Sequence, residues 1–246
     1  PESGQTSINV TNGKIIRLLV DDEPFDVRYG TLVSHTRRLD LRAGVLRREA
    51  VWTSPAGRTV RVRSTRLVSL TQRAIAAVHY EVEPLDGPAR IVLQSELVAN
   101  EEMPRRHDDP RAAAALTDPL VSDLHKVSDD RVTFVHTVRH SGLRVASAMA
   151  HHAELVTPQE WTDPETLGTR VEAEANLGRY MVWGVISPGQ TVRLTKFVAY
   201  GWSSTRSLPA VRDQVDAALA AAAHGGWEDL CREQRECLEG FWHRSD

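Results

Sequence analysis

The chain contains ten histidines, a residue type that commonly binds transition metals. His136 and His140 are four residues apart in a predicted strand, so their side chains share a face about 13 Å apart and cannot reach one ion. His151 and His152 are adjacent and point to opposite faces of a strand. A zinc ion needs three or four converging ligands. The spacing therefore predicts no metal site, and we expect no cofactor.

Acidic side chains could carry out a second kind of chemistry, the acid-base cleavage of a glycosidic bond. Adjacent carboxylates occur at Glu101–Glu102, Asp108–Asp109 and Asp129–Asp130. Each pair lies in a predicted turn or loop, where acids that contact only solvent are common. The sequence shows no P-loop, dinucleotide fingerprint or nucleophile elbow beside them. We therefore assign no catalytic residue within the chain.

Tryptophans could stack on a sugar ring or fill a hydrophobic core, and the chain has six of them. Trp52, Trp183 and Trp202 lie in strand-like segments, and we predict that they pack in the core. Trp161 lies in a predicted loop between residues 157 and 167. It is the tryptophan that we predict to contact a ligand.

Sugar mutarotation is a third chemistry, and it needs an acid and a base that converge in a cleft. His79, His136 and Glu81 could supply these groups, because all three occupy predicted strands. Their positions in the sequence do not show that they meet, so this alternative stays open.

The elements that must position these side chains are mostly strands. Alternation is strongest between residues 28 and 70, where it predicts three strands joined by two tight turns. Upstream, Asn12-Gly13 lies between β-branched segments and predicts a hairpin. Downstream, residues 74–83 and 89–98 predict another strand pair, joined by a turn rich in proline and glycine.

Periodicity fails between residues 99 and 120, which we interpret as a solvated loop or as a loop that reaches a partner domain. Beyond it the alternation returns. Strands are predicted at 120–128, 131–140, 143–153, 169–175, 178–186 and 191–200. We therefore assign residues 1–204 to one β domain.

The last part of the chain, residues 205–246, changes to a helical period. Ser207 and Pro209 are typical of a helix start. Apolar residues then recur three or four positions apart, and Gly225-Gly226 separates two predicted helices.

Composition excludes some classes of partner. A net charge of −3 argues against a nucleic-acid partner, which would require a basic face. No apolar run approaches the roughly 20 residues that a membrane span needs. Cys231 and Cys237 are the only cysteines, which favours a reducing cytoplasm.

Several motifs, taken in order, resemble one known family. They are residues 27–32 (VRYGTL), 38–47 (RLDLRAGVLR) and 66–70 (RLVSL), followed by a closing helix with Glu233-Gln234 and residues 241–246 (FWHRSD). Nearly the whole chain is similar to the N-terminal domain of glycoside hydrolase family 65. That family comprises disaccharide phosphorylases acting on trehalose, maltose, kojibiose and nigerose, with some related hydrolases.

The resemblance implies a mainly β fold, a two-sheet antiparallel super-sandwich followed by two linker helices. It also implies a further segment of the domain before Pro1 and an (α/α)6 catalytic barrel after Asp246. In the family that barrel holds the catalytic acid and the phosphate-binding residues, and phosphate or water attacks with inversion at the anomeric carbon.

We therefore expect a structural, non-catalytic part of an enzyme that cleaves α-linked glucose disaccharides. Its expected partners are its own barrel and, in the full-length enzyme, an α-glucoside disaccharide and phosphate. A homodimer is a further expectation, and a stand-alone carbohydrate-binding β-sandwich module is the alternative function. The arginines at positions 38, 42, 47, 48 and 66 are interpreted as members of ion pairs rather than as a phosphate clamp.

Overall fold

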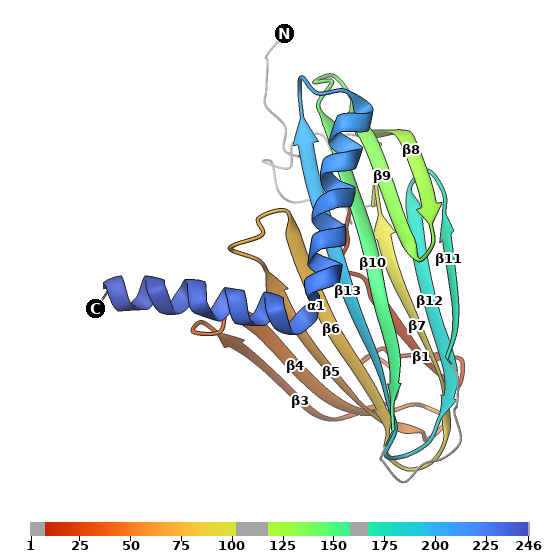
Figure 1. The fold of residues 1–246 in the computed structure, drawn as a ribbon. Coiled ribbons are helices and arrows are strands. Elements are labelled where there is room, and N and C mark those ends of the chain that lie inside the picture. Colours follow the sequence, from red (N-terminus) through yellow and green to blue (C-terminus); the bar gives the residue numbers. More distant parts are fainter. Residues whose placement is uncertain (1–7, 102–117, 158–166, 246) are drawn as a thin grey trace, which may run out of the picture.

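Residues 8–101, 118–157 and 167–245 are described by the computed structural model, in which strands precede a long helix (Figure 1). The strands form two antiparallel sheets that pack face to face, so the expected mainly β, two-sheet sandwich is confirmed. The five-stranded sheet has the order β11 (Gly168–Ala173), β12 (Leu177–Ile186), β7 (Ala89–Val98), β1 (Ile16–Val20) and β2 (Glu23–Pro24). The eight-stranded sheet has the order β3 (Thr31–Asp40), β4 (Val45–Thr53), β5 (Thr59–Val68), β6 (Ile75–Pro84), β13 (Thr191–Ser203), β10 (Arg144–Val156), β9 (Arg131–Val138) and β8 (Leu120–Ser128).

The predicted strands between residues 28 and 70 are confirmed as β3, β4 and β5, which pair in sequence order. Alternation explains which face each residue occupies. Val60 and Val62 of β5 are buried between the sheets, whereas Arg61 and Arg63 lie on the opposite face.

Two expectations about strand neighbours are wrong. The segments at 74–83 and 89–98 do not pair, because β6 joins β5 and β13 while β7 joins β1 and β12 in the other sheet. The link between them crosses from one sheet to the other. Alternation reports that a segment is a strand but carries no information about its partner.

Asn12-Gly13 does not form a hairpin. Asn12 instead makes a backbone bridge with Val98 at the margin of the five-stranded sheet. A Cβ atom on Gly13 would lie 2.7 Å from the Tyr200 hydroxyl. Glycine is therefore needed here for close packing against Tyr200 rather than for a turn.

Two layers of core stabilise the fold. The inner layer lies between the sheets and includes Trp52, Leu93, Phe134, Met149 and Leu194. The outer layer lies between the eight-stranded sheet and helix α1 (Leu208–Ser245). Its sheet side includes alanines, Ala146, Ala148, Ala150 and Ala199, whose small side chains let the helix approach closely.

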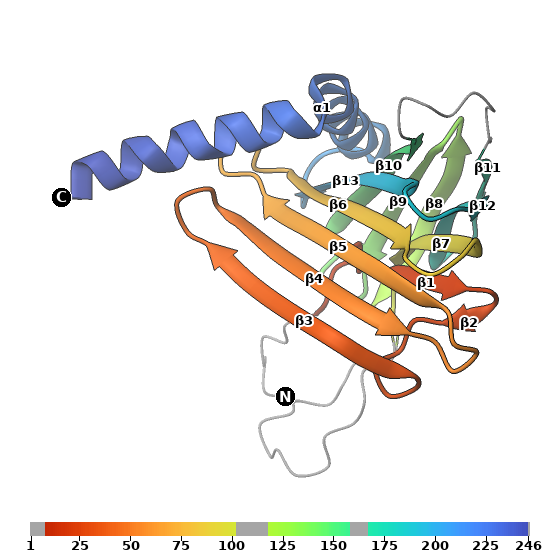
Figure 2. The same ribbon diagram turned by 90° about the horizontal axis from the view of Figure 1, so that it is seen from below.

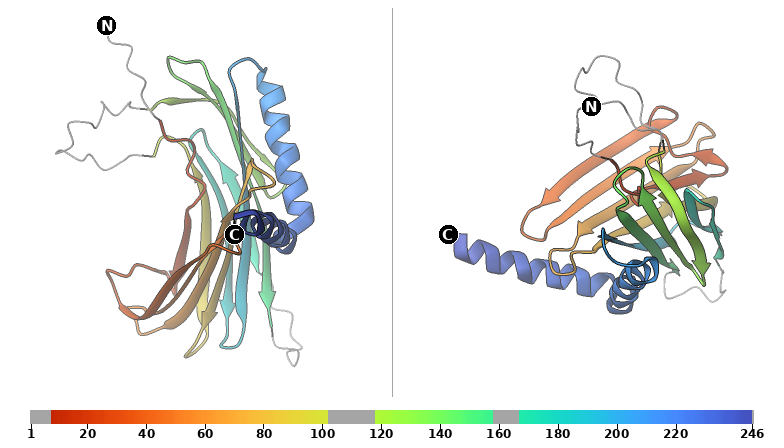
Figure 3. Two further views of the ribbon diagram at one scale, coloured as in Figure 1. Left: turned by 90° about the vertical axis from the view of Figure 1, so that its left-hand side faces the viewer. Right: turned by 90° about the horizontal axis from the view of Figure 1, so that it is seen from above.

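The two predicted helices run together as α1 with a break at Gly226, whose φ of 79° and ψ of −177° are not helical. The first half lies along the outer face of the eight-stranded sheet (Figure 3). The second half passes the ends of β4, β5 and β6 and extends away from the sandwich (Figure 2). Ser207 caps the helix start, since its side-chain oxygen accepts from the Ala210 amide. The division into domains at residue 204 stays a prediction.

The tryptophan predictions hold for one of three residues. Trp52 is fully buried, but Trp183 is 37% exposed and Trp202 is 70% exposed. Trp183 alternates with the buried Tyr180 and Val182 of β12, so its ring points to the outer face of the five-stranded sheet. A strand has two faces, and its own sequence does not show which of them is covered.

No helix in the described part of the chain combines the length and the apolar composition that a membrane span needs.

Candidate functional site

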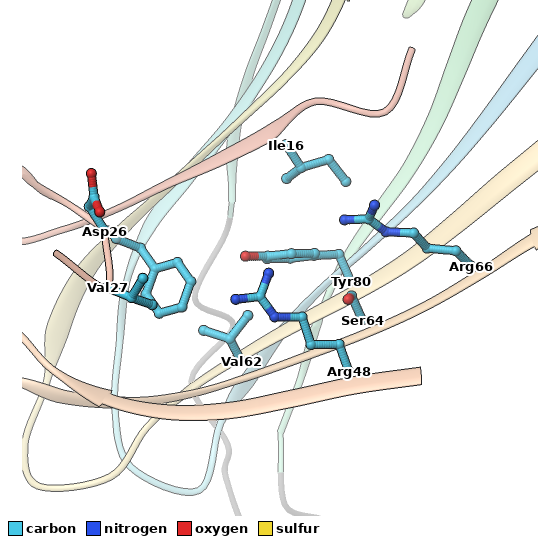
Figure 4. Close-up of a pocket in the computed structure, with 9 residues that line it drawn as sticks. Ile16, Asp26, Val27, Arg48, Val62, Ser64, Arg66 and Tyr80 are labelled. Carbon is cyan, nitrogen blue, oxygen red and sulfur yellow. The ribbon is translucent and has the colours of Figure 1, made fainter. Parts of the chain in front are cut away.

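A pocket of about 280 Å³ opens between the inner face of the eight-stranded sheet and the β1–β2 end of the facing sheet (Figure 4). Strands β4, β5 and β6 provide one wall, while β1 and the segment after β2 provide the other. Its lining combines apolar and polar side chains: Ile16, Phe25, Val27 and Val62 with Asp26, Arg48, Ser64, Arg66 and Tyr80.

Strand pairing explains why the polar residues meet. Arg37 of β3 is directly opposite Arg48 of β4, Arg48 is opposite Ser64 of β5, and Ser64 is opposite Tyr80 of β6. Directly paired residues point to the same face, and Arg66 shares that face because it is two positions beyond Ser64. Three arginines therefore share one face of the sheet, with Arg37 and Arg48 exposed and Arg66 half-buried, and like charges that are directly opposite destabilise a sheet.

The electrostatics of the pocket reflect this crowding. Burial lowers the pKa of Arg66, and the nearby positive charges of Arg48 and Arg37 lower it further. Burial also raises the pKa of the Tyr80 hydroxyl far above its usual value, so Tyr80 remains a proton donor at neutral pH. In the view of Figure 4 the Tyr80 side chain lies between the guanidinium groups of Arg48 and Arg66.

Few protein groups accept hydrogen bonds from the polar side chains of the pocket. Arg48 donates from Nε to His35 Nε2 at 3.1 Å. Within residues 8–101, 118–157 and 167–245, Arg66, Ser64 and the Tyr80 hydroxyl make no side-chain hydrogen bond or ion pair.

The carboxylate that lines the pocket is already paired. Arg28 donates to both oxygens of Asp26, and this hydrogen bonding lowers the pKa of Asp26 to about 2. Asp26 therefore neutralises little of the positive charge of Arg48 and Arg66 across the pocket.

The opposite face of the same sheet is arranged differently. Arg63 of β5 pairs with Glu49 of β4 at 2.8 Å. We call the series to which this pair belongs the outer ladder, and its other members are Arg61–Glu83 at 2.8 Å, Arg193–Glu81 at 3.2 Å and Arg193–Glu154 at 2.8 Å. Each arginine of the outer ladder thus has a carboxylate partner, in contrast to those on the inner face.

The ion pairs expected from the sequence are confirmed for one arginine. Arg47 pairs with Asp40 at 2.8 Å. For Arg48 and Arg66 the prediction is wrong, since no carboxylate of the described chain pairs with either, and the same holds for Arg38 and Arg42. A sequence signal for the pocket exists: Arg66 occupies the same alternate positions as the buried Val60 and Val62.

The three residues considered for mutarotation do not all meet. His79 and Glu81 are neighbours on β6, with 3.9 Å between His79 Nε2 and Glu81 Oε1. The His79 ring stacks on Trp227 of α1, on the outer face of the sheet. His136 lies three strands away on β9, where it contacts the Ala175 carbonyl. Burial lowers the pKa of both histidines.

Some predicted sites lie outside the described residues. Trp161 is one of them, so its contact with a ligand stays a prediction. The body of the 99–120 loop, residues 102–117, is another. Its two ends are held together by Asn100, which bonds both the amide and the carbonyl of Leu120. The described residues contain no group of three side chains suited to a metal ion.

A second polar cluster lies deep between the sheets, centred on Lys196 of β13. The Lys196 ammonium donates to the carbonyl oxygens of Glu96 at 2.7 Å and Ile15 at 3.3 Å. Burial lowers the pKa of Lys196 to about 7. His151, the cross-strand partner of Lys196, stacks on Tyr180 and is also buried, which lowers its pKa. These groups do not line the pocket and we assign them a structural role.

Comparison with known proteins decides the family. Residues 1–241 match the model of the glycosyl hydrolase family 65 N-terminal domain. The chain belongs to this family. The expectation drawn from the motifs at 27–32, 38–47 and 66–70 is therefore confirmed.

Two relatives align along nearly the whole chain. It is 48% identical over 246 residues to an uncharacterized glycosyl hydrolase of Mycobacterium tuberculosis, covering 100% of this chain and 30% of that protein. It is 26% identical over 247 residues to the alpha,alpha-trehalose phosphorylase of Thermoanaerobacter brockii, covering 99% and 30%. The chain thus spans 30% of the length of these relatives.

A solved structure has the same fold. It belongs to a protein provisionally named as a kojibiose phosphorylase from human microbiome, and it superposes with a TM-score of 0.78 at 16% identity. The superposition covers 96% of this chain and 28% of the other. At this identity the likeness shows the fold alone.

Proposed function

We propose that the chain is the non-catalytic N-terminal domain of a family 65 enzyme that cleaves α-linked glucose disaccharides with inversion, using phosphate or water. The family match over residues 1–241 carries the proposal, together with relatives more than three times as long. The described residues support it as well, because the pocket carboxylate, Asp26, is paired with Arg28, and His79 with its neighbour Glu81 lies against Trp227 on the outer face rather than in the pocket.

Helix α1 supports a role in positioning a catalytic barrel. Its second half is held to the sandwich at defined points, since Gln234 bonds the backbone of Gly44, Val68 and Leu70. Trp242 Nε1 donates to the Leu41 carbonyl near the helix end. A helix fixed in this way would hold a following domain at a set angle to the sheets. A cytoplasmic location and a homodimer remain part of this proposal.

The isolated chain is expected to show no turnover of trehalose, maltose or kojibiose, with or without phosphate, because the groups that protonate the glycosidic oxygen lie in the barrel. Released glucose and glucose 1-phosphate would be measured by a coupled assay. A longer protein that includes the barrel serves as the positive control. Turnover by the isolated chain would contradict the proposal, and heat of binding with maltose in titration calorimetry would instead favour a stand-alone carbohydrate-binding module.

A further inference from the structure

The inner-face pocket has a charge arrangement that the fold itself does not explain. Arg37 and Arg48 are directly opposite each other, and Arg66 is close enough for both to lower its pKa. The arginines of the outer ladder, in the same sheet, each have a carboxylate partner. A sheet that pairs its charges on one face and leaves them unpaired on the other carries a repulsion that an anion would relieve.

The side chains that line the pocket indicate which chemical group the anion carries. Arg48 and Arg66 present planar forks of donors, which suit the two oxygens of a carboxylate or phosphate. The hydroxyls of Ser64 and Tyr80 have no partner among the described residues and can donate to the same oxygens. Ile16 and Val62 add apolar walls to the pocket, while Arg48 is exposed and Arg66 half-buried, so an anion can reach both from solvent.

We propose that this pocket is an oxyanion site, in which Arg48 and Arg66 bind a phosphate or carboxylate group and the Ser64 and Tyr80 hydroxyls donate to it. The volume of about 280 Å³ admits a group of this size with part of the molecule that carries it. Two sources share the chemistry: a free anion, or a carboxylate side chain from another part of the longer protein. The readouts are therefore anion binding and the thermal stability of the chain.

Inorganic phosphate is the first probe, used on the 246-residue chain in a thermal melt. Phosphate at roughly five times its Kd is expected to raise Tm by about 2–4 °C relative to sodium chloride of equal ionic strength. The double variant R48Q/R66Q should lose this shift. The matched control R61Q/R63Q also removes two arginines from the same sheet, but from its outer ladder, and should keep the shift.

A second readout does not depend on phosphate. In low salt without added anion, R48Q/R66Q is expected to melt at or above the Tm of the unmodified chain, since it removes repulsion. R61Q/R63Q is expected to melt below it, because it breaks ion pairs. If R48Q/R66Q does not fold, R66K replaces it. R66K keeps the charge but loses the fork, and it should weaken phosphate binding about tenfold.

The longer protein distinguishes the two sources. If phosphate raises its Tm as well, the site takes a free anion. If phosphate has no effect there and R48Q/R66Q lowers its Tm, a carboxylate of the longer chain fills the site. Equal shifts from phosphate and chloride in the isolated chain, or a phosphate shift that persists in R48Q/R66Q, would overturn the proposal. Neither result depends on the enzyme activity proposed above.

Discussion

Replacing Gln234 with alanine is expected to lower the free energy of unfolding by about 3 kcal/mol, because buried hydrogen-bonding groups are left without partners. Gln234 is 3% exposed, although the residues that follow it on α1, up to 244, are exposed or half-buried. Its side-chain oxygen accepts from the Leu70 amide at 2.9 Å, and its side-chain nitrogen donates to the Gly44 and Val68 carbonyls at 3.2 Å each. One side chain thus ties α1 to two turns of the eight-stranded sheet.

Urea unfolding measures the loss, and Glu233 provides the matched control. Glu233 is adjacent and also bonds the sheet, but through the exposed Thr71 and the half-buried Gln72. E233A should therefore cost less than about 1 kcal/mol. Hydrogen exchange should locate the effect of Q234A in residues 227–245, with residues 208–225 still protected by the outer core. Equal losses in Q234A and E233A would show that the burial of Gln234 has no energetic role.

The buried lysine makes stability depend on pH. The unfolded chain holds the Lys196 proton up to a pKa of 10.5, whereas the folded chain releases it near 7. Between these values the unfolded state binds more protons, so the folded state gains stability as pH rises. Relative to K196M, the wild-type chain is expected to gain about 2 kcal/mol between pH 7 and pH 9.

Chemical denaturation at the two pH values tests this expectation. The comparison uses the change with pH rather than the absolute stability, since methionine also leaves the Glu96 and Ile15 carbonyls without their donor. Lys126, which is exposed on β8, supplies the control K126M, and its curve should follow that of the wild type. Parallel pH dependence in the wild type and K196M would mean that Lys196 stays protonated in the folded chain.

Local sequence pattern predicts local structure in this chain. The strands β3, β4 and β5 follow from alternation, and the helix start follows from Ser207. Gln234 lies four positions after the buried Leu230, on the same helix face, which agrees with its burial. The position of each strand in its sheet does not follow in this way, because β7 pairs with β12 some 80 residues later through contacts that no short segment encodes.

The sequence does not predict the pocket at Arg66 or the cluster around Lys196, for a related reason. Lys196 shares alternate positions with the buried Val192 and Leu194, just as Arg66 does with Val60 and Val62. A charged residue in an inward position is therefore a detectable signal. The role of such a residue cannot be read from the sequence, since Lys196 donates to enclosed carbonyl groups while Arg66 lines a pocket. The two environments differ because the five-stranded sheet covers Lys196, whereas Arg66 lies beside the β1–β2 end of that sheet.

Strand β3 forms one edge of the eight-stranded sheet, and all but the last of its ten residues are exposed. An uncovered strand of this length offers amide and carbonyl groups to which another chain could add, a common route to aggregation. The β3–β4 register shifts between Leu32 and Ser34, which interrupts the regular edge. Arg37 and Arg38 add charge to the same strand, and bulges and charges are known protections for open edges. The positive charge near the pocket thus also discourages the assembly of copies of this domain through β3.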